Sequence, residues 1–207
     1  MKENVSEDTE TRILKAAEQE FLTKGFVGAR TTVIAQKAGV THAMFHYYFR
    51  TKEKIYERII TEKMMMIKNI ILESIEADGL TLEKIVRNII DKHLEFISAN
   101  PDLPHFTIGE LYNNPDRTGD IIASIRLLAP PIIKRLQKKI DETADEGKCR
   151  RISAQSLFID ILSLNLFPYM ASPVINAVFS NCMHDSQEFL ETRKKDNFDT
   201  IMRKLKL

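Results

Sequence analysis

Two histidines, His42 and His46, lie four residues apart in a segment rich in aromatic and basic side chains. On a helix this spacing puts both imidazoles on one face, where they can bind a metal ion or form hydrogen bonds. A zinc site of the His-Glu-x-x-His type is disfavoured, because Ala43 stands where the glutamate is needed and no third ligand follows. Contact with a nucleic acid is the favoured interpretation, and we expect neither a metal ion nor a cofactor.

The elements that must position these histidines form a helix-turn-helix pattern, which places one helix in the major groove of DNA. The first short helix is expected to begin at Thr31 or Thr32, whose hydroxyl can cap it, and to end at Gly39. A glycine suits position 39 because the chain reverses there within a few residues. The second short helix is expected over residues 41–48, with Thr41 as its N-cap.

The second short helix has two distinct faces. Phe45 and Phe49 are four residues apart and are expected in the core. On the outward face His42 can bond a guanine, while Ala43 and Met44 can contact thymine methyl groups. Threonine, tyrosine and lysine side chains nearby suit phosphates, which fix the register. The predicted DNA-binding residues are Thr31, Thr32, Thr41, His42, Ala43, Met44, His46, Tyr47, Tyr48 and Lys52.

Charge is distributed unevenly along the chain. Between Phe21 and Lys54 there are six lysines and arginines and a single acid, Glu53, whereas the net charge of the 207 residues is only +1. A basic segment on a nearly neutral protein predicts a polyanionic partner for that segment alone.

The remaining sequence predicts an all-α protein, because glycine and proline are few and no run alternates as strands do. Further helices are expected over about residues 8–24, 51–77, 81–99, 106–112, 119–146, 153–171 and 186–205. Pro130 and Pro131 are expected to kink or divide one of them. The long helix that starts near residue 51 would join an N-terminal head to a helical body.

The head resembles the tetracycline-repressor (TetR) family over roughly residues 11–56. The resemblance rests on Gly25-Phe26, on Ile34-Ala35-x-x-Ala38-Gly39-Val40-Thr41, and on Tyr48-Phe49-x-x-Lys52-Glu53-x-Ile55. The chain departs from the family at Phe45-His46, where Leu-Tyr is usual, and at Ala43, where Gly is frequent. The family's tyrosine at the His46 position contacts a phosphate. Here a neutral or protonated imidazole can replace it, and Tyr47 or Tyr48 can share the contact.

The resemblance also implies the organisation of the whole chain. Residues 1–56 would be the helix-turn-helix DNA-binding domain, and residues 57–207 a helical domain for ligand binding and dimerisation. The protein would be a homodimeric repressor on a palindromic DNA operator, released by a small apolar or aromatic effector. The alternative is a protein that binds DNA constitutively and whose body binds a protein partner.

The resemblance assigns two sets of residues in the body. Candidates for the ligand pocket, which combine apolar bulk with polar groups, are His93, Phe96, His105, Phe106, Tyr112, Arg126, Phe158 and Asn165. Candidates for the dimer interface, on the last two predicted helices, are Leu157, Ile161, Leu164, Pro168, Phe189, Leu190, Phe198, Ile201, Met202 and Leu205. The alternative for the second set is the core of a single chain.

Other features restrict the class of protein. Cys149 and Cys182 are far apart and predict free thiols in a reducing, cytoplasmic compartment. The stretch between Asp160 and Asp185 has no charged residue, but prolines 168 and 173 interrupt it, so a buried helix is favoured over a membrane span. No nucleophile elbow, phosphate-binding glycine loop or acidic pair is found, and we expect no enzyme.

Overall fold

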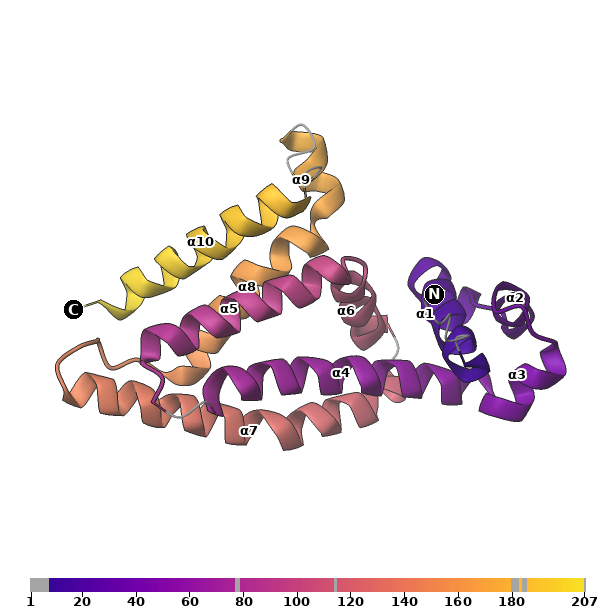
Figure 1. Ribbon diagram of the computed structural model, residues 1–207, viewed down its shortest axis with the longest axis horizontal. Coiled ribbons are helices and arrows are strands. Elements are labelled where there is room, and N and C mark those ends of the chain that lie inside the picture. The colour runs from indigo at the N-terminus through magenta and orange to yellow at the C-terminus, as the bar shows by residue number, and fades with distance from the viewer. Residues whose placement is uncertain (1–7, 77–78, 114, 180–182, 184–185, 207) are drawn as a thin grey trace, which may run out of the picture. The chain divides into compact units, whose positions relative to one another are not determined.

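The computed structural model describes residues 8–76, 79–113, 115–179, 183 and 186–206, so that Cys182 lies outside the described residues. Within these ranges every regular element is a helix, as the sequence predicted (Figure 1). The chain divides into two compact units, Met1–Met65 and Met66–Leu207. The division falls inside helix α4 (Lys52–Glu76), later than the expected boundary between residues 56 and 57.

The first unit contains α1 (Thr9–Gly28), α2 (Thr31–Lys37), α3 (His42–Phe49) and the beginning of α4. Helix α1 is expected to end at Gly25, and the chain leaves helical geometry there, with φ 65° and ψ 173°, before one more turn. The core of this unit is apolar and well filled. Its largest fully buried side chains are Ile13, Phe21, Ile34, Phe45, Ile55 and Ile60.

The turn between α2 and α3 follows the predicted pattern. Gly39 has φ +66°, a conformation that costs a residue with a Cβ atom about 1 kcal/mol or more. The Val40 amide donates to the Ala35 carbonyl at 3.0 Å and closes the turn. The Thr41 hydroxyl then caps α3 by accepting from the Met44 amide at 3.2 Å.

The predicted cap of α2 is wrong. Helix α2 begins at Thr31 with Arg30 as its N-cap, and no side chain caps it. Thr31 is already helical, and its hydroxyl is engaged with His42 instead. The unmet amides at the start of α2 are therefore left to water or to a ligand.

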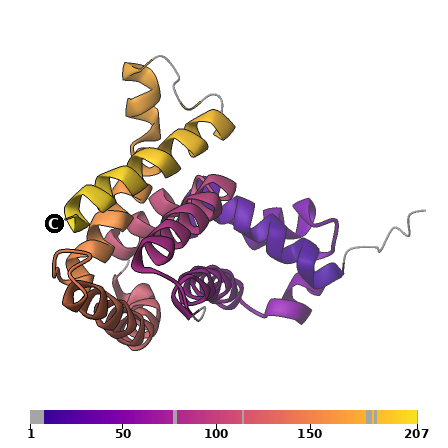
Figure 2. The same ribbon diagram turned by 60° about the vertical axis from the view of Figure 1, so that its left-hand side comes forward.

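The second unit is built around three helices that lie side by side in both views, α5 (Leu82–Ala99), α8 (Ala154–Met170) and α10 (Ser186–Leu205) (Figures 1 and 2). Two further helices, α6 (Leu103–Asn113) and α7 (Pro115–Asp145), contact α8. Helix α7 runs through Pro130 and Pro131 without dividing. The short α9 (Ser172–Val178), where we expected a turn, starts with Pro173 in its first turn, a position that tolerates proline.

The residues that we expected at a dimer interface lie in the core of this unit or pack against it. Those that are buried in the single chain are Leu157, Ile161, Pro168, Leu190, Phe198, Ile201 and Leu205, and those packed partly buried against the core are Leu164, Phe189 and Met202. All of them except Pro168 belong to, or pack against, one core cluster that includes Ile89 and Leu94 of α5. The apolar periodicity had identified the buried face correctly, but α5 of the same chain covers it.

A different set of apolar side chains on α8 and α9 faces outward. Ile159 and Phe167 are 54% and 64% exposed, and Val174, Val178 and Phe179 are about equally exposed. We call these five residues the α8–α9 apolar surface. No single helix among the described residues is long and apolar enough to cross a membrane; α8 and α9 pass that test only as a pair, bent by 70°.

The core assignment predicts the effect of truncating Leu157. Leu157→Ala should lower the free energy of unfolding by about 2–5 kcal/mol, because a fully buried leucine leaves a cavity. Gln155→Ala, at an exposed position of the same helix, should change it by less than about 0.5 kcal/mol. Urea unfolding at one fixed protein concentration measures both. A Leu157→Ala protein that unfolds like the wild type but dissociates into monomers would favour the interface assignment.

Candidate nucleic-acid interface

Helix α3 divides cleanly into an inner and an outer face. Phe45 and Phe49 are buried, with their ring centroids 6.2 Å apart. Tyr47, on the opposite side, is 82% exposed. The predicted DNA-binding residues that are exposed are Thr32, Thr41, His42, Ala43, Met44, His46, Tyr47 and Tyr48, while Thr31 is half-buried. The structure thus brings the predicted contacts of α3 onto one accessible surface.

A chain of hydrogen bonds runs along this surface. The Thr31 hydroxyl lies 2.9 Å from His42 Nε2, which in turn lies 3.2 Å from His46 Nε2. His46 Nδ1 lies 2.7 Å from the carbonyl oxygen of Arg50. Because a carbonyl only accepts, Nδ1 of His46 must carry the proton and donate it. Neutral His46 then has its lone pair on Nε2, toward His42.

Arg50 ends α3 in an unusual conformation. Its φ is +57°, which a residue with a side chain rarely adopts. The Arg50 amide donates to the His46 carbonyl at 3.0 Å, and its own carbonyl accepts from the His46 ring. These two bonds hold the imidazole of His46 and the C-terminus of α3 to each other.

The Lys52 ammonium, which we expected on a phosphate, is engaged within the head. Nζ donates to the carbonyls of Phe26 at 2.9 Å and of Ala29 at 3.1 Å, and it lies 4.5 Å from the centroid of the Phe26 ring. It therefore binds the chain where α1 ends and holds α4 to it. A phosphate contact by Lys52 stays a prediction, and the two carbonyls compete for the same protons.

Other cations of the basic segment are engaged as well. Lys37 pairs with the buried Glu20 at 2.6 Å, and Lys54 pairs with Glu57 at 3.0 Å. Arg30 and Arg50 are exposed, at the start of α2 and the end of α3. We counted these two arginines in the charge of the segment but did not select them as contacts. Their position beside the ends of two helices was the sequence signal that could have identified them as candidate DNA contacts.

In the second unit the structure brings together two of the predicted ligand residues. Asn165 Nδ2 donates to His93 Nδ1 at 3.1 Å and to the Ile90 carbonyl at 3.3 Å, while its Oδ1 accepts from Asn197 at 2.8 Å. Arg193 donates to Asn197 in turn. The three linked side chains of α5, α8 and α10 are almost fully buried. Burial lowers the pKa of His93 from 6.5 to about 4.

The other predicted ligand residues differ in exposure. Phe106 is buried, and Phe96 and Phe158 are half-buried. His105 is exposed, and Tyr112 is 83% exposed. Arg126 lines an open depression of about 540 Å³ on α7, together with Gly119, Ile122 and Ala123. Their role as ligand contacts stays a prediction.

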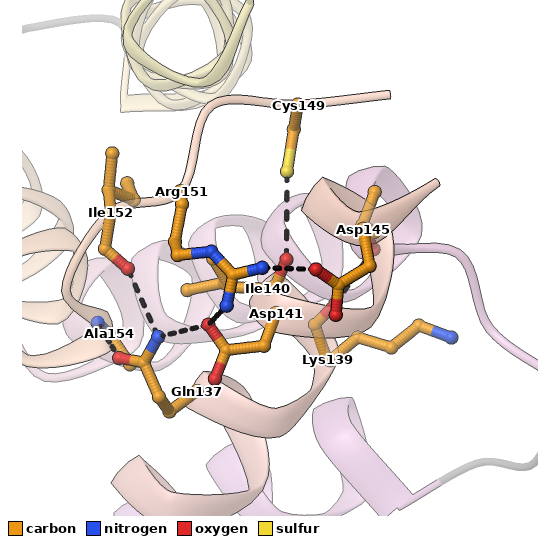
Figure 3. Close-up of polar contacts among 10 residues, drawn as sticks. Gln137, Lys139, Ile140, Asp141, Asp145, Cys149, Arg151, Ile152 and Ala154 are labelled. Carbon is orange, nitrogen blue, oxygen red and sulfur yellow. Dashed lines mark hydrogen bonds and ion pairs between the residues drawn. The ribbon is translucent and has the colours of Figure 1, made fainter. Parts of the chain in front are cut away.

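A second open depression, of about 700 Å³, lies over α7 and the start of α8. Two of its lining residues, Gln137 and Asp141, take part in the polar contacts of Figure 3: Gln137 donates to Asp141 at 3.0 Å and to the Ile152 carbonyl at 3.2 Å, and accepts from the Ala154 amide. Arg151 pairs with Asp141 and Asp145 (Figure 3). These bonds join the end of α7 to the start of α8. None of the predicted ligand residues lines this depression.

The Cys149 thiol lies in the same connection. Sγ donates to the Ile140 carbonyl at 3.8 Å (Figure 3), and burial raises the pKa of the thiol. A thiol held neutral in this way behaves as a small apolar side chain of the core.

A compact head whose second and third helices meet at a glycine turn, with polar side chains along the outside of the third, defines the helix-turn-helix class of DNA-binding domain. Residues 13–59 match the family described as bacterial regulatory proteins, tetR family. The head therefore carries the helix-turn-helix domain of the TetR family, as its sequence motifs indicated.

Three relatives extend this likeness. YdgC of Bacillus subtilis (strain 168), an uncharacterised HTH-type transcriptional regulator, is 29% identical over 99 residues, which are 46% of this chain. The chain spans about half of that protein, 51%. A Clostridium perfringens protein described as a fatty acid metabolism regulator is 14% identical with a TM-score of 0.71, over 95% of this chain and 99% of its own. A TetR-like transcriptional regulator from Rhodococcus sp. RHA1 is 14% identical with a TM-score of 0.66, over 94% of each chain. The two structures establish that the fold is shared along almost the whole chain.

The bonds of Lys52 predict a role in stability. Lys52→Met keeps the length of the side chain but removes the ammonium, and should lower the free energy of unfolding by about 1–2 kcal/mol. Lys54→Met removes only the exposed pair with Glu57 and should cost less than about 0.5 kcal/mol. Thermal unfolding followed by circular dichroism measures both. Equal effects of the two substitutions would contradict the role assigned to the carbonyl contacts.

Burial of His93 predicts a pH dependence of stability. Its pKa is about 4 in the folded protein, so the unfolded chain takes up the proton first as pH falls. The contribution is intact above about pH 6.5 and is lost toward pH 4, with roughly 2 kcal/mol gone at pH 5. His93→Gln, whose carbonyl can still accept from Asn165, should flatten the curve between pH 7 and 5. Equal slopes in the wild type and in His93→Gln would refute the assignment.

Proposed function

We propose that this chain is a homodimeric, cytoplasmic repressor that binds a palindromic DNA operator through α3. A small apolar or aromatic effector, bound in the second unit, would release it. The observation that carries the proposal is the division of α3 into a buried phenylalanine face and an exposed face of polar and aromatic side chains.

The outward face of α3 suits the major groove. His42 near the N-terminus of α3 is assigned to a guanine, and Ala43 and Met44 to thymine methyl groups. Tyr47 and Thr32 are exposed and are assigned to phosphates. Arg30 joins them, because it flanks the open amides at the start of α2, which attract anions.

The α8–α9 apolar surface supports the homodimer. Large apolar side chains that are more than half exposed often mark a protein–protein contact, and a twofold dimer contact brings the same surface of two chains together. Two heads about 34 Å apart, one helical turn of DNA, then read the two halves of a palindrome. We propose that Ile159, Phe167 and Val174 contact the partner chain at this interface, because most of the residues first expected there are buried in the core of the single chain.

Release by an effector requires two states of the dimer that differ in the spacing of the heads. The effector must bind the state that does not fit the operator more tightly, typically by ~1–3 kcal/mol. Helix α4 supports such coupling, because it belongs to both units of the chain. The half-buried Phe96 and Phe158 are the proposed apolar contacts for the effector.

The test is binding to the DNA that flanks the protein's own gene, followed by fluorescence anisotropy over a range of salt concentrations. The logarithm of the binding constant should fall linearly with the logarithm of the salt concentration, because contacts to phosphates release counterions from the DNA. Tyr47→Ala should weaken it at least about tenfold, or ~1.4 kcal/mol, by removing an exposed contact of α3. Tyr112→Ala, which removes an equally exposed tyrosine from α6, should leave the affinity unchanged.

The opposite pattern would decide against the proposal. If Tyr47→Ala binds the DNA as tightly as the wild type, α3 does not carry the contact. Affinity that is equal for the flanking DNA and for unrelated DNA of the same length would argue against an operator in that region.

A further inference from the structure

The two histidines of α3 are arranged as a pair of metal ligands. Their Nε2 atoms face each other at 3.2 Å, and the rings meet at 78° with centroids 4.4 Å apart. With Zn–N bonds near 2.0–2.1 Å, two ligands of a tetrahedral ion lie about 3.3 Å apart, and two adjacent ligands of an octahedral or square-planar ion about 2.9 Å. The observed separation falls between these values, so binding an ion requires little change in the distance between the two nitrogens.

A second contact sets the chemistry of one ligand. Histidines that bind metals usually donate their other ring N–H to a carbonyl or a carboxylate, which fixes the tautomer. His46 does so through Nδ1, to the Arg50 carbonyl at 2.7 Å. Its Nε2 therefore presents a lone pair toward His42.

The other ligand is supplied by a change of tautomer. Without a metal ion, a neutral His42 that carries its proton on Nε2 can donate it toward His46, and the same Nε2 also lies 2.9 Å from the Thr31 hydroxyl. When an ion takes the place of this proton, neutral His42 carries its proton on Nδ1. The Thr31 hydroxyl, 2.9 Å from His42 Nε2, offers an oxygen donor beside the two nitrogens.

We propose that His42 and His46 bind a divalent late first-row transition ion, Cu²⁺, Ni²⁺ or Zn²⁺, on the outward face of α3. Imidazole nitrogens favour these ions over Mg²⁺ and Ca²⁺, which prefer oxygen ligands. Both histidines are exposed, so water can fill the other positions of the ion. The described residues contain no group of three or more His, Cys, Asp and Glu side chains that could hold a metal ion, and a two-imidazole site binds Cu²⁺ and Ni²⁺ ahead of weaker ions of the series.

A metal ion at this site would affect DNA binding. This effect rests on the proposed function, whereas the metal site itself does not. A bound ion occupies both Nε2 atoms. His42 then loses its bond to a base, and His46 its bond to a phosphate. Metal binding therefore weakens DNA binding, and DNA weakens metal binding by the same factor.

The test is an isothermal titration of Ni²⁺ into the untagged full-length protein without DNA. One Ni²⁺ should bind per chain, and His42→Ala and His46→Ala should each weaken it roughly 100-fold, because the second imidazole acts as a linked ligand. His105→Ala, which removes an exposed histidine of α6, should bind Ni²⁺ like the wild type. Thermal unfolding shows whether each variant is folded, and His46→Gln replaces any His46→Ala protein that is not.

The Cu²⁺ complex gives a second readout. Its electron paramagnetic resonance spectrum should show coupling to two imidazole nitrogens in the wild type and to one in His42→Ala or His46→Gln. The proposal is overturned if Ni²⁺ binds these folded variants as tightly as the wild type, or if the wild type takes up no Ni²⁺. Because no DNA is present, either result leaves the proposed regulatory function to its own test.

Discussion

An eight-residue helix is too short to be stable in water by itself, and the candidate interface depends on how the head holds α3 in place. Two buried side chains, Phe45 and Phe49, attach one face of α3 to the core. The Thr41 hydroxyl satisfies its first turn, and the Gly39 turn sets where it begins. The exposed face follows from this attachment, since the side chains opposite two buried phenylalanines have nowhere else to point.

Several charged side chains of the head also have a structural role. Lys37 and Lys52 look available in the sequence, but one neutralises a buried carboxylate and the other binds two backbone carbonyls. A buried carboxylate or an unpaired backbone carbonyl at a helix end destabilises the folded state unless a partner is present. These two lysines therefore stabilise the fold. The positive surface offered to a polyanion then rests more on Arg30 and Arg50, and on the amides at the start of α2.

Local signals made the head predictable. A glycine with positive φ, a threonine cap and phenylalanines four apart act within a few residues, and the structure follows them at Gly39, Thr41 and Phe45. Contacts between residues far apart in the sequence could not be predicted from it. The two carbonyls held by Lys52 lie more than twenty residues away, and the partner of Asn165 lies on α5. Periodicity on α8 and α10 told which face is buried but could not tell whether the same chain or a second one covers it.

The proposed function depends most on the outward face of α3 being the surface that contacts DNA. The direct measurement is a titration of isotopically labelled protein with duplex DNA from the region flanking its gene, followed by amide chemical shifts in TROSY spectra. The proposed function predicts the largest changes at the start of α2 and along α3, from Thr41 to Tyr48, with α5 of the second unit little affected. Large changes confined to α8 and α10, with α3 unmoved, would contradict it.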